Sequence, residues 1–417
     1  MLHHYNSLSN KMDKSLLAVR NINHKYIVVD RRKQIFIRCC YGYSVSGMAV
    51  LVIGAILPSV IAEAGISFLA AGGLLSVMAV GNLLSSFLFP VMVPAMGRRF
   101  SITGMTAMAP LCLLGLTLLP PLPVMYGIML VYGLVRGSVT IINNAAVNDI
   151  YDGGAAGKLN LLHCSFAVGA FLAPFLTAVL LKLGFGWRSV VYLLIFITAT
   201  SALTYGTMDY SLLNERARDA APLKQSGKRE GRGFLKSFQF HCIALILFFY
   251  LGVENCINGW FVTYLQNTGV MSETYATTLV SVTWLVIMAG RLVCASLSGR
   301  MRRSSLILIN ALGSGICFFL LISTKSLPLI TLALIGFGFF LAGIYPTCIA
   351  DAGPLIQGST FGMSVLTAIS AMGGILTPQI VGGAADHVGI VAAIGILVVN
   401  VILVILLAGI NRKKYCD

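Results

Sequence analysis

The sequence predicts an all-α membrane protein that crosses the bilayer twelve times, and three observations support this prediction. Of the 417 residues, 57% are hydrophobic and only 10% are charged, whereas about a quarter of the residues in a soluble domain are charged. The apolar residues form twelve runs, each near the roughly 20 residues that a helix needs to cross a bilayer. Lys and Arg are concentrated in alternate connections between these runs. This composition excludes a soluble globular enzyme.

The twelve expected spans are separated by charged residues, Gly or Pro. The third and fourth runs touch at Pro120, Pro121 and Pro123, which are expected to end one helix and begin the next. A single long helix is therefore not expected there. The first six spans cover residues 36–61, 67–93, 101–120, 122–148, 158–182 and 188–210, and the last six cover residues 239–265, 274–298, 304–323, 327–350, 357–382 and 388–411.

The distribution of positive charge predicts the orientation. Lys and Arg number 29 against 14 Asp and Glu, which gives a formal net charge of +15. With a cytoplasmic N-terminus, 24 of these cations fall in cytoplasmic segments, and only Lys182, Arg188 and Lys325 fall in outer loops. Because cytoplasmic loops are enriched in Lys and Arg, we expect a multi-pass protein of the cell (inner or plasma) membrane with both termini in the cytoplasm. The expected partner of this charge is the lipid bilayer and not nucleic acid.

The chain is expected to consist of two related halves. Residues 211–238 form the longest hydrophilic interruption, a cytoplasmic linker between an N-terminal six-helix bundle (36–210) and a C-terminal one (239–411). The segment Gly169-Ala-Phe-Leu-Ala-Pro174 matches Gly373-Gly-Ile-Leu-Thr-Pro378 at an offset of 204 residues. Together these features predict two pseudo-symmetric bundles with a site between them, as in secondary transporters. Residues 1–35 are expected to be a disordered cytoplasmic tail, and residues 412–417 a second tail.

Motifs for enzymatic or metal chemistry are missing from the sequence. The chain has ten cysteines, nine of them within apolar stretches and none in a Cys-x-x-Cys pair, so neither a zinc site nor a disulfide framework is expected. There is also no Walker loop, metal-ligand cluster or nucleophile motif. We therefore expect no enzymatic activity and no cofactor, and transport driven by an ion gradient or by the solute's own gradient.

From about residue 35 to 412 the chain resembles the major facilitator superfamily. Gly97-Arg98-Arg99, after the second span, is similar to the end of that superfamily's cytoplasmic loop signature, although the acidic residue expected three positions earlier is Pro94 here. The resemblance implies the major facilitator fold, in which two six-helix bundles move about a central site. It also implies a gating role for Gly97, Arg98 and Arg99.

Three passages resemble the fucose/galactose/glucose proton symporter branch of that superfamily. This narrower resemblance implies uptake of a monosaccharide together with a coupling ion. The first span, around Ser44 to Leu57, has no carboxylate where the fucose permease carries one, so neither fucose nor that permease's protonation route is expected. The three passages are Leu159-Asn-Leu-Leu-His163 with Phe166-Ala-Val-Gly169-Ala170 and Pro174, then Tyr250-Leu-Gly252-Val-Glu254 with Asn258-Gly259-Trp260 and Thr263-Tyr264, and Gly343-Ile-Tyr345-Pro346.

Glu254 is the first candidate for the transport site, because a charge at the centre of a bilayer costs at least about 2.5–3.5 kcal/mol and needs a reason. It lies roughly 22 Å from the inner end of span seven and shares a helical face with Tyr250 and Asn258. A protonatable carboxylate here can carry a coupling proton or bind solute hydroxyls. The alternative is a structural hydrogen bond or ion pair between helices.

Arg136 is the second candidate, about 18 Å from the inner end of span four. Asn143 and Asn144 follow it on one polar stripe. Because its depth is close to that of Glu254, the two side chains can face each other across a central cavity. Alternatively, Arg136 pins its own bundle, or it meets a substrate carboxylate, in which case the solute is an acid.

Five further residues are candidates of lower specificity. Arg291 lies only about 12 Å from the inner end of span eight, where a gating contact with cytoplasmic loops is expected to prevail over substrate contact. His163 near the inner mouth of span five is either a titrating switch or a structural histidine. Trp260 and Trp284 can each stack on a sugar ring or simply pack, and Asn143, Asn144, Asn258 and Gln379 can bond hydroxyls.

The leading hypothesis is proton-coupled uptake of a sugar or similar small polar solute by alternating access, by a protein expected to act as a monomer. The first alternative is proton-coupled efflux of drugs or metabolites, although Ala173-Pro174-Phe-Leu-Thr-Ala lacks the glycines of the stretch typical of such antiporters. The second is uptake of an organic acid. A membrane sensor without flux is disfavoured, because the longest cytoplasmic segments are polar, basic and poor in large apolar residues.

Overall fold

The computed structural model describes residues 2–151, 155–214, 232–298, 300–356 and 360–414. Within these ranges the protein is helical and contains no strand. Twelve helical segments are long and apolar enough to cross a membrane. The predicted all-α polytopic fold class is confirmed.

The N-terminal half contains six long helices, and each begins or ends where the sequence supplies a local reason. Ser67 caps the second helix by accepting a hydrogen bond from the Ala70 backbone N–H at 3.1 Å. Gly97, with φ of +79°, lies between the second and third helices. The six helices are α1 (Leu2–Ala64), α2 (Phe68–Met96), α3 (Arg98–Thr117), α4 (Leu122–Ile150), α5 (Ala155–Lys182) and α6 (Trp187–Gly206).

The C-terminal half repeats this pattern with two interrupted spans. The tenth span, expected as one helix, is divided at Ala342 and Gly343. Pro346 explains the break, because proline has no N–H to donate and its ring clashes with the carbonyl four residues earlier. The elements are η2 (Arg232–Lys236), α8 (Phe238–Asn267), α9 (Glu273–Leu297), α10 (Arg303–Ser323), α11 (Leu327–Leu341), α12 (Ile344–Ile356), α13 (Thr360–Val388), α14 (Ile390–Ala393), η3 (Ile394–Ile396) and α15 (Leu397–Lys414).

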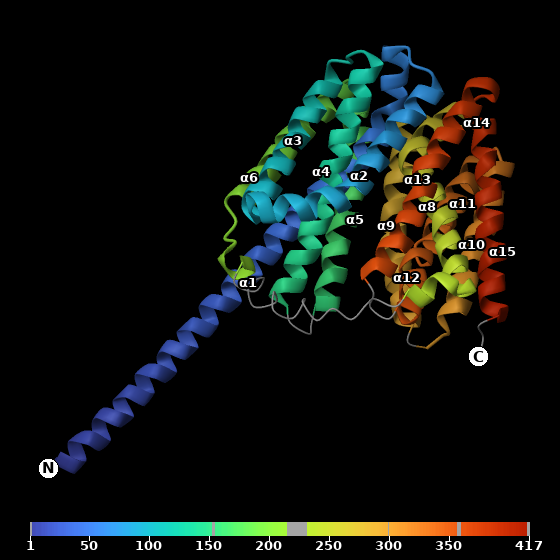
Figure 1. Ribbon diagram of the computed structural model, residues 1–417. Helices are drawn as coiled ribbons and strands as arrows, with labels where there is room; N and C mark the ends of the chain where they lie inside the picture. The colour runs from blue at the N-terminus through green and yellow to red at the C-terminus, as the bar shows by residue number, and fades with distance from the viewer. Residues whose placement is uncertain (1, 152–154, 215–231, 299, 357–359, 415–417) are drawn as a thin grey trace.

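The two halves lie side by side, and their internal packing is related by the offset seen in the sequence (Figure 1). In the first half, Gly169 of α5 abuts the carbonyl oxygen of Ser44 in α1, where no Cβ would fit. In the second half, Gly373 of α13 abuts the carbonyl oxygen of Phe248 in α8. Both partners are separated by the same 204 residues. The repeated glycines therefore permit the same close helix contact in each half.

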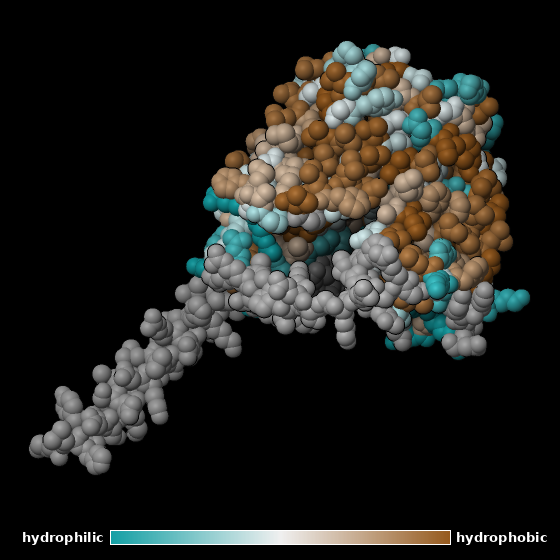
Figure 2. Space-filling view, in the orientation of Figure 1, coloured by the Kyte–Doolittle hydropathy of each residue, from teal (hydrophilic) through white to brown (hydrophobic). Residues whose placement is uncertain are grey.

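We call the two ends of the bundle the linker face and the far face. The linker face carries η2 and the ends of the chain, and the far face carries the short connections near residues 65, 119, 184, 269, 325 and 389 (Figure 1). Hydrophobic side chains cover much of the visible flank between the two faces (Figure 2). Such a flank fits a protein whose sides contact lipid rather than water.

The N-terminal segment differs from the expectation of a disordered tail. α1 runs without interruption from Leu2 to Ala64, and its first part projects beyond the bundle (Figure 1). The chain has no Gly or Pro before Gly42. Because extending an existing helix costs far less than starting one, nothing in this segment stops the helix of the first span from continuing. Residues 215–231 of the expected linker and the tail residues 415–417 lie outside the described ranges.

The halves meet along three helix pairs, α2 with α13, α5 with α9, and α1 with α8. Towards the far face the contact is tight. Gly54 of α1 lies directly against the backbone oxygen of Asn258 in α8. The Asp386 carboxylate of α13 accepts hydrogen bonds from the backbone N–H groups of Phe68 (2.7 Å) and Leu69 (3.0 Å) at the start of α2. A carboxylate is favoured there by the helix dipole.

At the linker face the polar contacts are of a different kind, because they join elements of the same half. Arg31 pairs with Asp209 at 3.7 Å, and Asn411 donates to Asp351 at 3.0 Å. Figure 2 shows a recess between the halves near this face. The structure is therefore closed at the far face and open towards the linker face.

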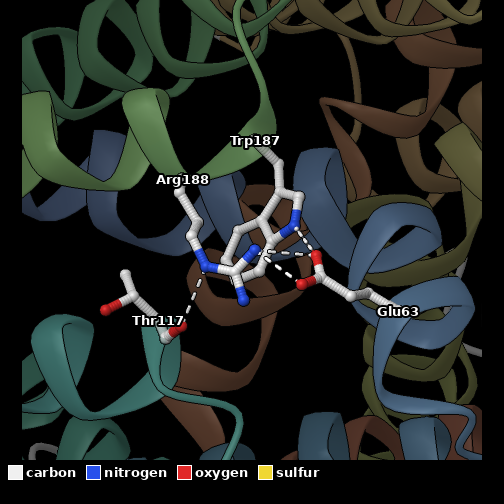
Figure 3. Close-up of polar contacts among 4 residues, drawn as sticks. All are labelled: Glu63, Thr117, Trp187 and Arg188. Atoms are coloured by element: carbon white, nitrogen blue, oxygen red, sulfur yellow. Dashed lines mark hydrogen bonds and ion pairs between the residues drawn. The ribbon is translucent and has the colours of Figure 1, made fainter.

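At the far face, a cluster of polar contacts joins helices of the N-terminal half to one another. Glu63 at the end of α1 accepts hydrogen bonds from the Trp187 indole and from Arg188, both at 2.8 Å (Figure 3). Arg188 also donates to the carbonyl oxygen of Thr117 at 3.0 Å. These contacts hold the ends of α1, α3 and α6 together.

Candidate functional site

The centre of the site is an ion pair between two helices of the C-terminal half. Glu254 of α8 lies 3.8 Å from Arg291 of α9, measured from Oε1 to Nη2. The two side chains are 17% and 31% exposed, so they are largely but not fully buried. Arg291 was expected to make a gating contact with the cytoplasmic loops, and the structure pairs it with Glu254 within the membrane. A long arginine side chain can reach along the helix axis to a partner at another depth, and the gating role of Arg291 stays a prediction.

Arg136 brings a charge from the N-terminal half to the same place. It lines a cleft between the halves together with Gly54, Asn255, Asn258 and Pro378. The empty space in this cleft is about 330 Å³. Glu254 is the acidic group whose charge acts on Arg136. Arg136 and Glu254 therefore lie near enough for their charges to interact, and that they face each other across a central cavity stays a prediction.

A second cavity, with about 400 Å³ of empty space, lies inside the N-terminal half behind the cleft. Its lining comes from α1, α3, α4 and α6, and it includes Tyr132, Thr198 and Ser201. Arg136 lines this cavity as well as the cleft. The guanidinium of Arg136 therefore lies between an interior space of one half and the space between the halves.

Aromatic side chains continue the site on both sides. Tyr43 of α1 lies with its hydroxyl 3.4 Å from Nδ1 of His163 in α5, and its ring contacts Phe166 at 5.2 Å. Phe166 in turn contacts Trp284 of α9 across the boundary between the halves, at 6.2 Å between ring centres. His163 is exposed. The described contacts therefore connect His163 to Trp284 by way of Tyr43 and Phe166.

Tyr250 has a partner that does not stand out in the sequence. Its ring is buried and lies 5.9 Å from the ring of Tyr345 in α12. Tyr250 also interacts with Glu254 one helical turn later, as their spacing predicted. Tyr43 and Tyr345 were missed because each lies in an apolar run where a tyrosine fits as an ordinary packed residue. Only the residues beside Tyr345, which belong to the Gly343-Ile-Tyr345-Pro346 passage, pointed to it.

Three candidate residues make packing or hydrogen-bond contacts and are not among the residues that line the cleft. Trp260 is fully buried, donates from Nε1 to the carbonyl oxygen of Pro378 at 3.0 Å and packs on Phe68. Asn143 is buried inside the N-terminal half and accepts a hydrogen bond from Tyr205 at 2.9 Å. Gln379 lies where α13 packs against Gly72 of α2. Helix rotation decides which side of a polar stripe faces the cleft, and the sequence alone does not fix that rotation.

Several buried polar atoms near the site have no hydrogen-bond partner among the described residues. Unpaired buried polar atoms are rare in folded proteins because each costs about 1–3 kcal/mol. In a transporter, they are the atoms that a bound solute can satisfy. They are Nε1 of Trp284, Nε of Arg291, Oδ1 of Asn258 and Oδ1 of Asn144.

The predicted gating residues lie at the linker face, away from the cleft. Arg98, at the start of α3, donates to the Asp149 carboxylate at 2.6 Å and to the carbonyl oxygen of Leu213 at 3.2 Å. Gly97 provides the turn before it, and Arg99 is exposed. Asp149, at the end of α4, thus supplies the carboxylate that Pro94 does not. In the second half Arg303 donates to the carbonyl oxygen of Ala350 at 2.8 Å, next to Asp351, which repeats the arrangement.

Replacing Asp149 by Asn should lower the thermal stability of the purified protein. The pair with Arg98 is partly buried, with side chains 18% and 29% exposed, and a charged hydrogen bond in such a place is worth about 1.5–3 kcal/mol. The matched control is Asp209→Asn, which removes a pair 3.7 Å long with both side chains more than half exposed, worth about 0–1 kcal/mol. Unfolding in detergent, followed by differential scanning fluorimetry, checks this. Equal losses in the two variants would contradict the assignment.

Comparison with known proteins agrees with this architecture. The family model of the Major Facilitator Superfamily matches residues 39–378. A TsgA homolog of Erwinia tasmaniensis is 24% identical over 387 residues, which cover 89% of this chain and 94% of that protein. The sodium-dependent glucose transporter 1A of Mus musculus is 23% identical over 295 residues, covering 62% of this chain and 68% of that protein.

Solved structures show the same fold at low sequence identity. A bacterial homologue of the lysosomal transporter Spinster, in an inward-facing conformation, superposes with a TM-score of 0.73 at 14% identity, covering 93% of this chain and 98% of that one. The D-xylose-proton symporter gives a TM-score of 0.73 at 14% identity, with 91% and 97% coverage. The nucleoside transporter NupG gives 0.72 at 13% identity, with 93% and 99% coverage.

Proposed function

The chain belongs to the major facilitator superfamily, and on that premise we propose that it takes up a sugar or similar small polar solute together with a proton. Membership makes it a multi-pass membrane protein and a secondary transporter, not an enzyme. The kind of solute, the coupling ion and the direction of transport are proposals. We also propose that the protein lies in the cell (inner or plasma) membrane, that its linker face is cytoplasmic and that it acts as a monomer.

The observation that carries the proposal is the position of Glu254. Of the acidic residues in the described part of the chain, it alone lies in the middle of a span, since the others lie in the N-terminal extension of α1, near the ends of helices or in the segments between spans. It pairs with Arg291, and Asn255 and Asn258 of the same helix line the cleft between the halves. A carboxylate so placed can take up a proton from one side of the membrane and release it to the other.

The proposed cycle follows from the geometry of closure. With the far face closed and the linker face open, the cleft is reached from the linker face. Uptake requires the opposite arrangement first, in which a solute and a proton enter from the far face. Protonation of Glu254 removes one charge from the cleft, and the bound solute then offers hydrogen-bond acceptors to Arg136 and Arg291. The two halves can then move past each other about the cleft, as in other transporters built from repeats.

The groups at the site support a small polar solute. The cleft is lined by Arg136, Asn255 and Asn258, whose side chains carry hydrogen-bonding groups. Unpaired polar atoms beside aromatic rings, such as Nε1 of Trp284 near Phe166, suit a molecule with several hydrogen-bonding groups. Two similar proteins carry sugars in their names, the sodium-dependent glucose transporter 1A and the D-xylose-proton symporter. Because the name of the former includes sodium dependence, sodium is the alternative coupling ion for this protein.

Transport by proteoliposomes tests this function. Purified protein is reconstituted, a pH gradient is imposed with the acidic side outside, and labelled sugars, polyols and sugar acids are offered in turn. The proposal expects at least one solute to accumulate above its external concentration, and collapse of the gradient with an uncoupler to abolish this accumulation. Repeating the assay with the gradient reversed separates uptake from efflux. Accumulation driven by sodium and unaffected by the uncoupler would reject proton coupling.

A further inference from the structure

The charges that meet at the cleft do not balance. Arg136 and Arg291 bring two positive charges, and Glu254 brings one negative charge. The other titratable side chains that interact with these three are Tyr43, Tyr132, Tyr250, Tyr345 and His163, none of which is an acid of the Asp or Glu type. Within the described residues, the site thus carries one uncompensated positive charge in the middle of the membrane.

The pairing geometry leaves most of the donors unused. The contact between Glu254 and Arg291 is a single one of 3.8 Å, longer than the roughly 2.7–2.9 Å of a charged hydrogen bond. Nε of Arg291 is buried and has no partner among the described residues. No hydrogen bond joins the guanidinium of Arg136 to a described residue. The backbone oxygen of Arg136, in contrast, accepts a hydrogen bond from the Thr140 hydroxyl at 3.2 Å. Each guanidinium has five N–H donors, so the cleft has many more donors than acceptors.

An uncompensated, largely buried cation is costly unless an anion joins it. A carboxylate fits the fork of a guanidinium by two parallel hydrogen bonds, which a neutral hydroxyl cannot reproduce. The nearby indole N–H of Trp284 offers a further donor to such a solute. The remaining unpaired oxygens, on Asn258 and Asn144, suit hydroxyl donors on the same molecule.

We infer that the transported solute carries one negative charge, a carboxylate, which Arg136 binds in the cleft with Arg291 beside it. A sugar acid or a hydroxy acid combines this carboxylate with the hydroxyl groups that the asparagine oxygens accept. This assignment rests on the proposed transport function and names its substrate class. The proton taken by Glu254 then balances the charge of the solute, so the loaded cleft has the same net charge as the empty one.

Binding of matched pairs of solutes tests the inference. The pairs share a carbon skeleton and differ in the charged group: D-glucuronate with D-glucose, D-galacturonate with D-galactose, and glycerate with glycerol. Binding to the full-length protein in nanodiscs is measured by isothermal calorimetry. The expected result is that at least one acid binds and its neutral counterpart binds at least about tenfold more weakly, the loss expected when a charged hydrogen bond is removed.

The variants separate Arg136 from the general charge of the protein. Arg136→Gln should weaken binding of the acid by at least about tenfold. Arg136→Lys keeps the positive charge but cannot form two parallel hydrogen bonds to a carboxylate, so it should recover part of the lost affinity. Lys325→Gln is the control, because it removes a positive charge at the exposed far-face connection and should leave binding unchanged. The Arg136→Gln protein is first shown to be folded by its elution as a single peak and by its melting temperature. If this folded protein binds the acid as tightly as the wild type, the inference is overturned.

Transport distinguishes a failure of this inference from a failure of the proposed function. Uptake of a neutral sugar, driven by the pH gradient and independent of Arg136, would leave the transport function intact and reject the anionic substrate. Uptake of an acid that the uncoupler does not affect would retain the anionic substrate and reject proton coupling. Uptake of an acid with one proton should also generate no current on a solid-supported membrane, since the two charges cancel, whereas uptake of a neutral sugar with a proton should generate one.

Discussion

Replacing Glu254 by Gln should abolish accumulation of the solute under a pH gradient while exchange of solute across the membrane continues. The substitution keeps the shape of the side chain and removes the only carboxylate in the middle of the described spans. Net accumulation depends on proton movement, whereas exchange of one solute molecule for another does not require the site to change its protonation. We expect accumulation to fall at least about tenfold. Labelled-solute uptake and counterflow in the same proteoliposomes measure the two activities.

Glu273→Gln provides the matched control for this substitution. Glu273 is exposed in the first turn of α9 at the far face, so its loss should leave accumulation unchanged. Accumulation that persists in Glu254→Gln at the level of the control would show that another group carries the proton. Loss of both accumulation and exchange would assign Glu254 to solute binding or to helix packing instead of coupling.

Replacing Gly54 by Ala should shift the protein towards the state that is open at the far face and slow uptake. A Cβ at Gly54 would overlap the backbone oxygen of Asn258, so α1 and α8 cannot keep their present contact. Overpacking of this kind costs about 1–3 kcal/mol, which changes the balance between the two open states by roughly 5- to 150-fold. Solute uptake should fall accordingly. The position of the equilibrium is measured by the rate at which a membrane-impermeant maleimide labels Leu75→Cys from the far face.

Leu75 is a suitable reporter because its side chain lies against Gly259 where the halves meet, and it is 6% exposed. Gly127→Ala is the matched control. It adds the same methyl group to α4, where nothing lies within 4 Å of the added atom, and in a helix Ala is favoured over Gly by about 1 kcal/mol. Faster labelling of Leu75→Cys in both backgrounds, or in neither, would contradict the role assigned to the contact between Gly54 and Asn258.

The twelve spans and the repeat could be predicted from the sequence because both depend on local features. Run length and the positions of charged residues decide whether a segment crosses a bilayer. The match at Gly169 and Gly373 predicted equivalent helix contacts, which the structure shows against Ser44 and Phe248. The break at Gly343 was not predicted, because a proline within an apolar run can kink a helix without ending it. The helical extension of α1 was not predicted, because composition does not show how far the helix of a span continues into a polar segment.

The candidate site was predictable in its charges but not in its contacts. Glu254 and Arg136 stand out because ionised residues within apolar runs are rare. Arg291 was placed with the loops, although it pairs with Glu254, because pairing between helices depends on tilt and side-chain reach. Trp260 and Asn143 lie on helices that reach the cleft, yet they point into packed regions. These facts depend on helix rotation, which the composition of a span does not specify.

Coupling through Glu254 requires that a proton enters together with the solute, and this proton movement can be measured directly. Cells expressing the protein are washed, suspended without buffer and supplied with an acid that the purified protein binds, while the external pH is recorded. The wild type should raise the external pH as solute enters, the Glu273→Gln control should do the same, and Glu254→Gln should give no change. Solute entry without a rise in pH in the wild type, or an unchanged rise in Glu254→Gln, would contradict coupling through this carboxylate.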